Sequence, residues 1–454
     1  MGKRDNESFI EYKQRVMNPI SSSFCAAKWF NATIWLGSGH TTSCHHPPGH
    51  AIDPVAVKEN YKLLHNTPHK KKCRDEMQKG DRPKECEYCW KIEDIQRDNV
   101  SDRIFKTVLY DEKDIDWAGK LDPQADVDLK TLEIAFDRTC NFACSYCNPA
   151  FSTTWANDVR DKGAYQKLKS DGRGHFTHAH DEAQPYLRNE ENPYITAFWK
   201  WWPELSQTLM ELRVTGGEPM LSPDVWKLLD LMEKNPSKMQ FALNSNLGGK
   251  DELIERLIEK SQKIQNFDLY TSNESLGSHA EYIRDGINSE RWWTNLEKVI
   301  TRGNFRQVHV MMTINSLCLF SVTEFMDRLV EFKRKHGRNK PLWSVNILRF
   351  PSFQNCLTLP EDIRTERKQH IERWLDKTKR EELIHDFERV SVERLVDYLD
   401  VVKTPHQDSS PLEILQRDFK NFFLQYDTRR GKNIRTAFAD HARFIEWFES
   451  VKVD

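Results

Sequence analysis

The sequence predicts an α/β fold whose centre is an open, partial barrel of six parallel strands. Short apolar runs alternate with helical patterns across the middle of the 454-residue chain, and beyond Pro360 the pattern is helical and highly charged. Alternating strands and helices form parallel sheets with crossover connections, and a closed barrel of this type needs eight such units. The six expected strands are residues 132–136, 210–215, 239–244, 267–271, 308–314 and 343–349.

Composition and charge exclude several classes of protein. Fourteen Trp, 24 Phe and 12 Tyr are inconsistent with disorder. A formal net charge of -2 gives no global basic field for nucleic acid. We find no run of about 18 apolar residues and no apolar signal core, so we expect a cytoplasmic protein without a membrane span. In that reducing compartment, ten cysteines grouped by spacing indicate metal rather than disulfides.

Three cysteines follow directly after the first expected strand. Cys140, Cys144 and Cys147 have the spacing C-x3-C-x2-C, with Tyr146 just before the last of them. Thiolates are soft ligands that select iron-sulfur clusters, zinc or copper(I). A structural zinc site is normally closed by four protein ligands, whereas a four-iron cluster held by three cysteines keeps one iron open. The spacing therefore favours a catalytic cluster over a zinc knuckle completed by a remote ligand.

A second motif follows the second expected strand. Residues 214–219 read Val-Thr-Gly-Gly-Glu-Pro. In this order the two motifs resemble the signature of the radical S-adenosylmethionine (SAM) superfamily. The resemblance implies a 4Fe-4S cluster on the three cysteines, reductive cleavage of SAM and abstraction of hydrogen from a substrate. It also implies that Gly216 and Gly217 allow close backbone approach and that the Glu218 carboxylate contacts the SAM ammonium.

Polar side chains gather at the carboxyl ends of the expected strands, where ligands bind in open parallel sheets. Asn, Ser and Thr are also common turn residues at such positions. By the same resemblance, Ser245, Ser272 and Asn315 would approach the SAM carboxylate and ribose, and Arg284 would pair with the carboxylate. The implied cofactor-binding residues are Tyr146, Gly216, Gly217, Glu218, Asn244, Ser245, Ser272, Arg284 and Asn315.

The N-terminal segment carries a second set of four cysteines, Cys25, Cys44, Cys86 and Cys89. This segment resembles the twitch (SPASM/twitch) module of radical SAM proteins, here placed ahead of the barrel. The resemblance rests on the order of its features: a cysteine, a Trp-bearing strand, a glycine turn, a second cysteine, a basic helix and a closing C-x2-C. This resemblance implies a second 4Fe-4S cluster without an open iron, acting as an electron relay or a structural brace. A four-cysteine zinc site would use the same ligands.

Several features have less specific interpretations. Cys73 lies in a basic helix whose face we expect to be solvated, although the thiol could replace Cys25 as a ligand. The histidines around Cys44 are also expected to be solvated, and Cys318 and Cys356 to be apolar fillers. Residues 98–129 read as a linker and residues 161–192 as a polar insertion. The expected domains are residues 1–120, 128–355 and 356–454.

The functional hypothesis is a radical SAM enzyme, an oxidoreductase with an oxidative outcome favoured. Its substrate would be a peptide or protein side chain, a sugar or a small metabolite, and its electron donor a flavodoxin or ferredoxin. One alternative is a zinc-stapled, non-catalytic interaction protein. Another is a radical SAM enzyme acting on nucleic acid, suggested by the basic run 70–74 and by Trp199, Trp201 and Trp202, which could stack on bases. Core packing explains these tryptophans more simply.

Overall fold

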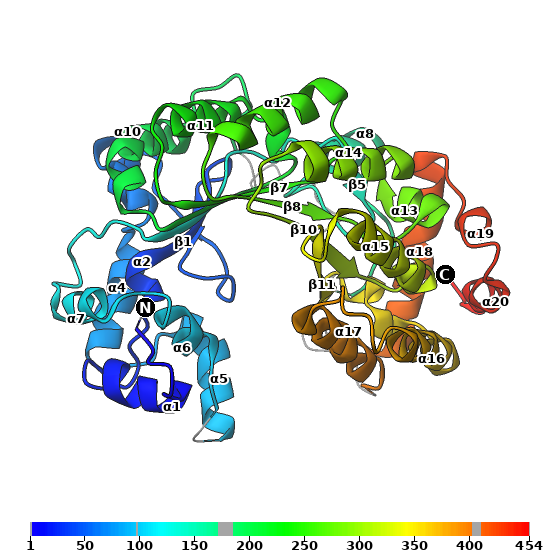
Figure 1. The fold of residues 1–454 in the computed structure, drawn as a ribbon, viewed down its shortest axis with the longest axis horizontal. Helices are drawn as coiled ribbons and strands as arrows, with labels where there is room; N and C mark the ends of the chain where they lie inside the picture. Colours follow the sequence, from blue (N-terminus) through cyan, green and yellow to red (C-terminus); the bar gives the residue numbers. More distant parts are fainter. Residues whose placement is uncertain (1, 97–98, 171–184, 402–409, 454) are drawn as a thin grey trace. The chain divides into compact units, whose positions relative to one another are not determined.

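Figure 1 shows the computed structural model, which describes residues 2–96, 99–170, 185–401 and 410–453. The chain divides into two compact units. The first unit contains residues 1–137 and 182–214, and the second contains residues 138–181 and 215–454. Within the described ranges, we find no helix that is both long and apolar enough to span a membrane.

The sheet of the first unit combines the first two expected strands with the N-terminal segment. Strand β4 (Thr131–Ala135) pairs in parallel with β1 (Asn31–Trp35), which forms an antiparallel hairpin with β2 (His40–Thr42). Strand β3 (His50–Ala51) continues this antiparallel edge, and β6 (Glu211–Thr215) lies on the far side of β4. The hairpin that follows Cys25 is therefore part of the same sheet as the first expected strand.

Short helices surround this sheet. Two of them lie in residues 98–129, the region expected to be a linker, and a third lies directly before it. The linker prediction is wrong, because Ile104, Ile115 and Ala118 in this region are fully buried. Asp111 and Asp114, which look like linker residues, lie at the N-cap and in the first turn of a helix, where a negative charge is favourable. The helices are α1 (Phe9–Tyr12), α2 (Ala27–Phe30), α3 (Ala56–Glu59), α4 (Pro68–Gln78), α5 (Glu87–Ile95), α6 (Asp102–Thr107), α7 (Glu112–Lys120) and α10 (Pro193–Thr208).

The second unit contains the other four expected strands. They are β7 (Gln240–Ser245), β8 (Phe267–Ser272), β10 (Gln307–Ile314) and β11 (Leu342–Ile347), and each pairs in parallel with the next. Helices α11 (Pro223–Lys234), α12 (Asp251–Lys263) and α14 (Ser289–Arg302) lie along one face of this sheet (Figure 1). All six predicted strands are thus present, and four of them form a continuous parallel sheet.

Local sequence explains where α11 begins. Proline stands at its first position, and Val225, Leu228, Leu229 and Met232 are buried at helical spacing, as expected. Ser222 occupies the N-cap position but its side chain makes no capping hydrogen bond. The remaining helices of the unit are α8 (Thr153–Lys162), α13 (Gly277–Ile283), α15 (Val322–His336), α16 (Glu361–Lys377), α17 (Asp386–Leu399), α18 (Leu412–Arg430), α19 (Ile434–Ala437) and α20 (Ala442–Ser450).

The C-terminal helices complete the core of the second unit. The aromatic residues of α18 and α20 that sequence patterning assigned to packing, including Phe422, Tyr426 and Phe444, are buried. Helix α17 covers the outer edge of β11: the Trp343 N–H donates to a Glu388 carboxylate oxygen at 3.0 Å, and the Val345 N–H to the Ser391 hydroxyl at 3.3 Å. Edge-strand donors are thereby satisfied without another strand. Of the expected polar insertion, residues 171–184 lie outside the described residues.

Candidate functional site

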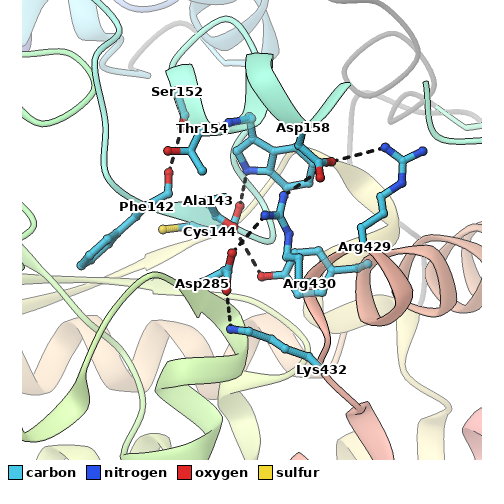
Figure 2. A network of polar contacts seen from close by, with 12 residues as sticks. Phe142, Ala143, Cys144, Ser152, Thr154, Asp158, Asp285, Arg429, Arg430 and Lys432 are labelled. Atoms are coloured by element: carbon cyan, nitrogen blue, oxygen red, sulfur yellow. Dashed lines mark hydrogen bonds and ion pairs between the residues drawn. The ribbon is translucent and has the colours of Figure 1, made fainter. Parts of the chain in front are cut away.

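The loop that carries Cys140, Cys144 and Cys147 is held by its backbone. Strand β5 (Ala143–Cys144) pairs with β9 (Arg284–Asp285) in a separate antiparallel sheet. The Cys140 carbonyl accepts from the Thr154 hydroxyl at 2.7 Å, and the Cys144 carbonyl from the Trp155 indole N–H at 2.9 Å. Figure 2 shows Cys144 and Thr154 beside the start of α8. Because the carbonyls are engaged in this way, the loop has a fixed shape that leaves its three sulfurs available as ligands.

Helix α18 reinforces the loop from the C-terminal region. Arg430 pairs with Asp285 at 3.0 Å and Lys432 with the same carboxylate at 2.7 Å, while Arg429 reaches Asp158 on α8 at 3.3 Å (Figure 2). Asp285 is in the strand that pairs with Ala143 and Cys144. The C-terminal helices therefore do more than fill the core, since they fix both the partner strand of the cysteine loop and the helix that follows it.

The Gly-Gly-Glu-Pro motif lies directly against the cysteine loop. The Glu218 N–H donates to the Thr139 carbonyl at 2.6 Å. A Cβ atom added to Gly217 would be 2.3 Å from that carbonyl oxygen, and Gly216 has a φ of 125°, which other residues rarely adopt. The two motifs are about seventy residues apart in the sequence, yet their backbones touch. A side chain at position 217 would push the cysteine loop away.

Glu218, which follows the two glycines, is 1% exposed. Its carboxylate accepts from the Asn246 N–H at 2.6 Å and from the Met220 N–H at 3.1 Å. Burial raises the pKa of the Glu218 carboxyl to about 7, although these two N–H groups lower it. A nearby cation would favour the charged form of this buried carboxylate, which suits the ammonium group that the sequence resemblance implies.

A buried network lies behind the loop. Arg284 forms a two-pronged ion pair with Glu274, with nitrogen-oxygen distances of 2.6 and 3.1 Å, and the Tyr146 hydroxyl donates to Glu274 at 3.1 Å. A further guanidinium nitrogen of Arg284 is 3.9 Å from the Cys144 sulfur. The arginine thus already has a carboxylate partner within the chain, and its pairing with SAM stays a prediction. Glu274 is absent from the predicted site residues, although its position after the fourth strand was a usable signal.

The strand-end residues divide into two groups. Ser245 accepts from the Leu247 N–H at 3.0 Å, and Asn315 accepts from the N–H groups of Leu317 and Cys318, so both stabilise turns. Asn244 and Ser272 instead lie on one face of the sheet, because Asn244 is in register with Tyr270, two residues before Ser272. The Asn244 side-chain oxygen is buried and has no hydrogen-bond partner among the described residues. Such an acceptor is costly unless a ligand satisfies it.

The four N-terminal cysteines are brought together. Cys25, Cys44, Cys86 and Cys89 line one cavity of the first unit, with about 420 Å³ of space that no protein atom fills, part of it open to solvent. They come from four places in the sequence: the start of α2, the end of the β1–β2 hairpin, a short 3-10 segment (Lys84–Cys86) and helix α5. Burial raises the pKa of the Cys25 thiol to about 11 and that of Cys86 to about 12. A bound cation would be needed to hold them as thiolates.

The spacing of the sulfurs differs from that of a zinc site. Sulfur ligands of one tetrahedral zinc ion are about 3.8 Å apart, given a zinc-sulfur distance of about 2.3 Å. In the described part of the chain, which includes every cysteine, two groups of three ligand atoms lie within 4.8 Å of one another, and neither contains sulfur. In a four-iron cluster each sulfur binds a different iron, so the sulfurs are farther apart. Among the described residues, neither cysteine set therefore places three sulfurs within 4.8 Å of one another.

The basic face of helix α4 is buried, although the sequence predicts that it is solvated. Lys70, Cys73 and Arg74 are all buried, and the Lys70 ammonium donates to the Thr41 hydroxyl at 2.8 Å. This prediction is wrong because the positive charges are satisfied inside the unit by hydroxyl, carbonyl and imidazole groups. Cys73 is not among the residues that line the four-cysteine cavity.

Two of the three tryptophans that suggested nucleic acid are buried. Trp201 is fully buried and donates to Asp128 at 3.0 Å, and Trp202 is 8% exposed. Trp199 stacks against Phe136 with ring centroids 5.7 Å apart. Buried rings cannot stack on bases, so core packing, the simpler interpretation, holds for Trp201 and Trp202. Lys70 and Arg74 are buried too, but Lys72 is exposed and Trp199 is half-buried, so burial removes only part of the motivation for a nucleic-acid substrate.

Comparisons with known proteins give a distant likeness. No protein-family model and no curated protein matches the chain. Among solved structures, the chain is similar to SuiB of Streptococcus suis, at 15% identity and a TM-score of 0.35 over 71% of this chain and 63% of SuiB. Structures of SuiB bound to S-adenosylmethionine and to the precursor peptide SuiA give 14% and 13% identity, each with a TM-score of 0.36. These two comparisons cover 77% and 78% of this chain, and 69% and 70% of SuiB. The chain thus spans less than two thirds of the first of these structures, and the likeness is one of fold.

Proposed function

We propose that this chain is a radical SAM enzyme. The observation that carries the proposal is the junction of the two motifs, in which Gly217 packs on the backbone beside Cys140 and presents a buried carboxylate, Glu218, next to the cysteine loop. A zinc knuckle does not explain this contact. Three thiols and an adjacent carboxylate are what a cluster with one open iron and an amino-acid-like cofactor require.

The roles of the residues follow from this arrangement. Cys140, Cys144 and Cys147 would hold the 4Fe-4S cluster, and Glu218 would bind the SAM ammonium. The buried Asn244 oxygen would accept a hydrogen bond from the cofactor, and Ser272 lies on the same face of the sheet. When bound, the cluster and SAM supply one-electron cleavage of the sulfonium and hydrogen abstraction from the substrate. The chain's own part is to fix the cluster loop, orient the cofactor and exclude water.

The second cysteine set would hold an auxiliary cluster without an open iron. Four thiols occupy all four irons, so this cluster would relay electrons or brace the fold rather than bind substrate. Lys28 and Arg103 line the same cavity, and positive charge stabilises the negative charge of a thiolate-bound cluster. We therefore favour an oxidative outcome, in which the substrate radical gives an electron to this cluster. The substrate would be a peptide or protein side chain, a sugar or a small metabolite, and a flavodoxin or ferredoxin would donate the first electron.

Metal analysis tests the proposal. We expect about eight iron and eight sulfide per chain after anaerobic reconstitution, with visible absorbance that bleaches on reduction by dithionite. Gly217→Ala should lose about half of this iron because its Cβ would collide with the Thr139 carbonyl. Gly49→Ala is the matched control, since its Cβ would be 3.5 Å or more from any atom beyond its chain neighbours. Zinc without iron after reconstitution would instead support the non-catalytic, zinc-stapled alternative.

A further inference from the structure

A second group of metal-ligating side chains lies near the four-cysteine cavity but is separate from it. His50, His69 and Glu85 each offer one ligand atom, and these three atoms lie within 4.8 Å of one another. Cys73, one helical turn after His69 on α4, has its sulfur 3.9 Å from the His69 Nε2 atom. None of these four residues belongs to the predicted cluster ligands. Three of them, His50, His69 and Glu85, have the tight spacing that is missing from the cysteine sets.

The orientation of His50 is that of a metal ligand. Its Nε2 atom is 2.8 Å from the Thr67 hydroxyl, while its Nδ1 atom is buried and has no hydrogen-bond partner among the described residues. Metal-bound histidines commonly use one ring nitrogen for the metal and the other for a neighbouring polar group, which fixes the ring. A buried nitrogen without a partner costs free energy unless something binds to it. The geometry therefore points to an occupant beside the Nδ1 atom.

The donor set selects the kind of metal. We propose that His50, His69 and Glu85 hold a Zn²⁺ ion in the first unit, and that the Cys73 sulfur, which lies outside this group of three, moves in to complete a tetrahedral site. Two imidazoles, one thiolate and one carboxylate are typical zinc ligands, whereas iron-sulfur sites are built from thiolates. In a tetrahedral site the nitrogen and sulfur ligands are about 3.6 Å apart, close to the 3.9 Å between His69 and Cys73.

Negative groups lie beside the positive charges near the site. Lys28, which is 2% exposed, forms an ion pair with Glu85, and the other carboxylate oxygen of Glu85 contacts His69. The Glu85 oxygen and a Cys73 thiolate supply two negative charges to a divalent ion. Lys28 also lines the four-cysteine cavity, where the cluster thiolates add further negative charge.

The site would connect three parts of the N-terminal unit. His50 is in β3, His69 and Cys73 are in α4, and Glu85 directly precedes Cys86, a proposed cluster ligand. A zinc ion would fix the position of Cys86 through its neighbour. The proposal does not depend on radical SAM activity, because zinc can be measured while SAM cleavage and iron content are unchanged.

Metal content and X-ray absorption test this site on the full-length, anaerobically reconstituted protein, supplied with zinc chloride. We expect about one zinc per chain, with an absorption spectrum that fits two nitrogens, one sulfur and one oxygen. His50→Ala and Cys73→Ala should each lower zinc by at least fivefold while about eight iron remain, and retained iron shows that the variants fold. His40→Ala, in the same hairpin but outside the group, should keep its zinc.

Three results would overturn the proposal. The first is wild-type protein that binds no zinc, and the second is zinc content that both substitutions leave unchanged. The third is a four-sulfur absorption spectrum, with zinc lost in Cys86→Ala, which would place zinc in the four-cysteine cavity instead. That last result would also contradict an auxiliary cluster at the four N-terminal cysteines. If only the proposed radical SAM function is wrong, the zinc absorption spectrum should still show two nitrogen ligands. The absorption measurement on wild-type protein needs no variant to fold.

Discussion

The two cysteine sites of this chain are built in opposite ways. Cys140, Cys144 and Cys147 fall within eight residues, on one loop whose carbonyls are bonded to the helix after it. The four N-terminal cysteines span 65 residues of sequence and meet only because a hairpin, two helices and a short 3-10 segment pack together. The first site is local and needs tertiary structure mainly to bring Glu218 to it. The second exists only when its unit is folded.

Removing one thiol from the loop should have the largest effect. Cys144→Ala leaves two ligands for the first cluster, so we expect loss of about four iron and of all SAM cleavage, with the N-terminal iron retained. Iron and sulfide analysis with a SAM cleavage assay measures both. Cys318→Ala, a fully buried thiol outside both sets, is the control and should keep its iron. Loss of all eight iron in Cys144→Ala would contradict the independence of the two sites.

Removing two thiols from the N-terminal set tests the function of that site separately from the first. Cys86→Ala combined with Cys89→Ala should remove about four iron and abolish product formation, while SAM cleavage uncoupled from product continues. Because these ligands come from separate elements, we also expect a lower melting temperature than for Cys144→Ala. Calorimetry and product analysis test this prediction. Persistent product formation would show that the N-terminal site is no electron relay.

Glu218→Gln should affect the cofactor but not the cluster. Replacing a buried carboxylate that faces an ammonium should weaken SAM binding by about 10- to 100-fold, or about 1.5 to 3 kcal/mol, with iron unchanged. Burial raises the pKa of Glu218 to about 7, and only the ionised carboxylate attracts the ammonium. SAM binding should therefore strengthen as pH rises through about 7 in the wild type. Calorimetric titrations that show the same pH dependence in the glutamine variant would refute this role.

The smallest effect should come from the C-terminal support of the loop. Arg430→Met removes an ion pair to Asp285, but Lys432 still binds that carboxylate. We expect the free energy of unfolding to fall by about 1 to 3 kcal/mol, with iron content unchanged. Arg443→Met, an exposed arginine, is the matched control and should change stability by less than about 1 kcal/mol. Denaturant unfolding measures the difference, and equal effects in both variants would argue against the support.

The sequence was informative where the fold is local. Apolar runs located all six strands, and proline with helical spacing placed α11, because these signals depend on a few neighbouring residues. The prediction of a solvated face on α4 failed because Lys70 looks solvated but is hydrogen-bonded to a distant residue. The prediction of a linker at residues 98–129 failed because polar residues there, such as Asp111, start a helix. The buried Glu274–Arg284 pair and the His50 group could not be predicted, since each joins residues that are distant along the chain.

Cleavage of SAM tests the central claim most directly. The anaerobically reconstituted chain, reduced with dithionite, should convert SAM to 5'-deoxyadenosine and methionine, and Cys144→Ala should form neither product. This outcome would establish that the loop of three cysteines and Glu218 form a working radical SAM site. If protein that carries about eight iron per chain cleaves no SAM at any pH between about 6 and 8, the account of this site is wrong.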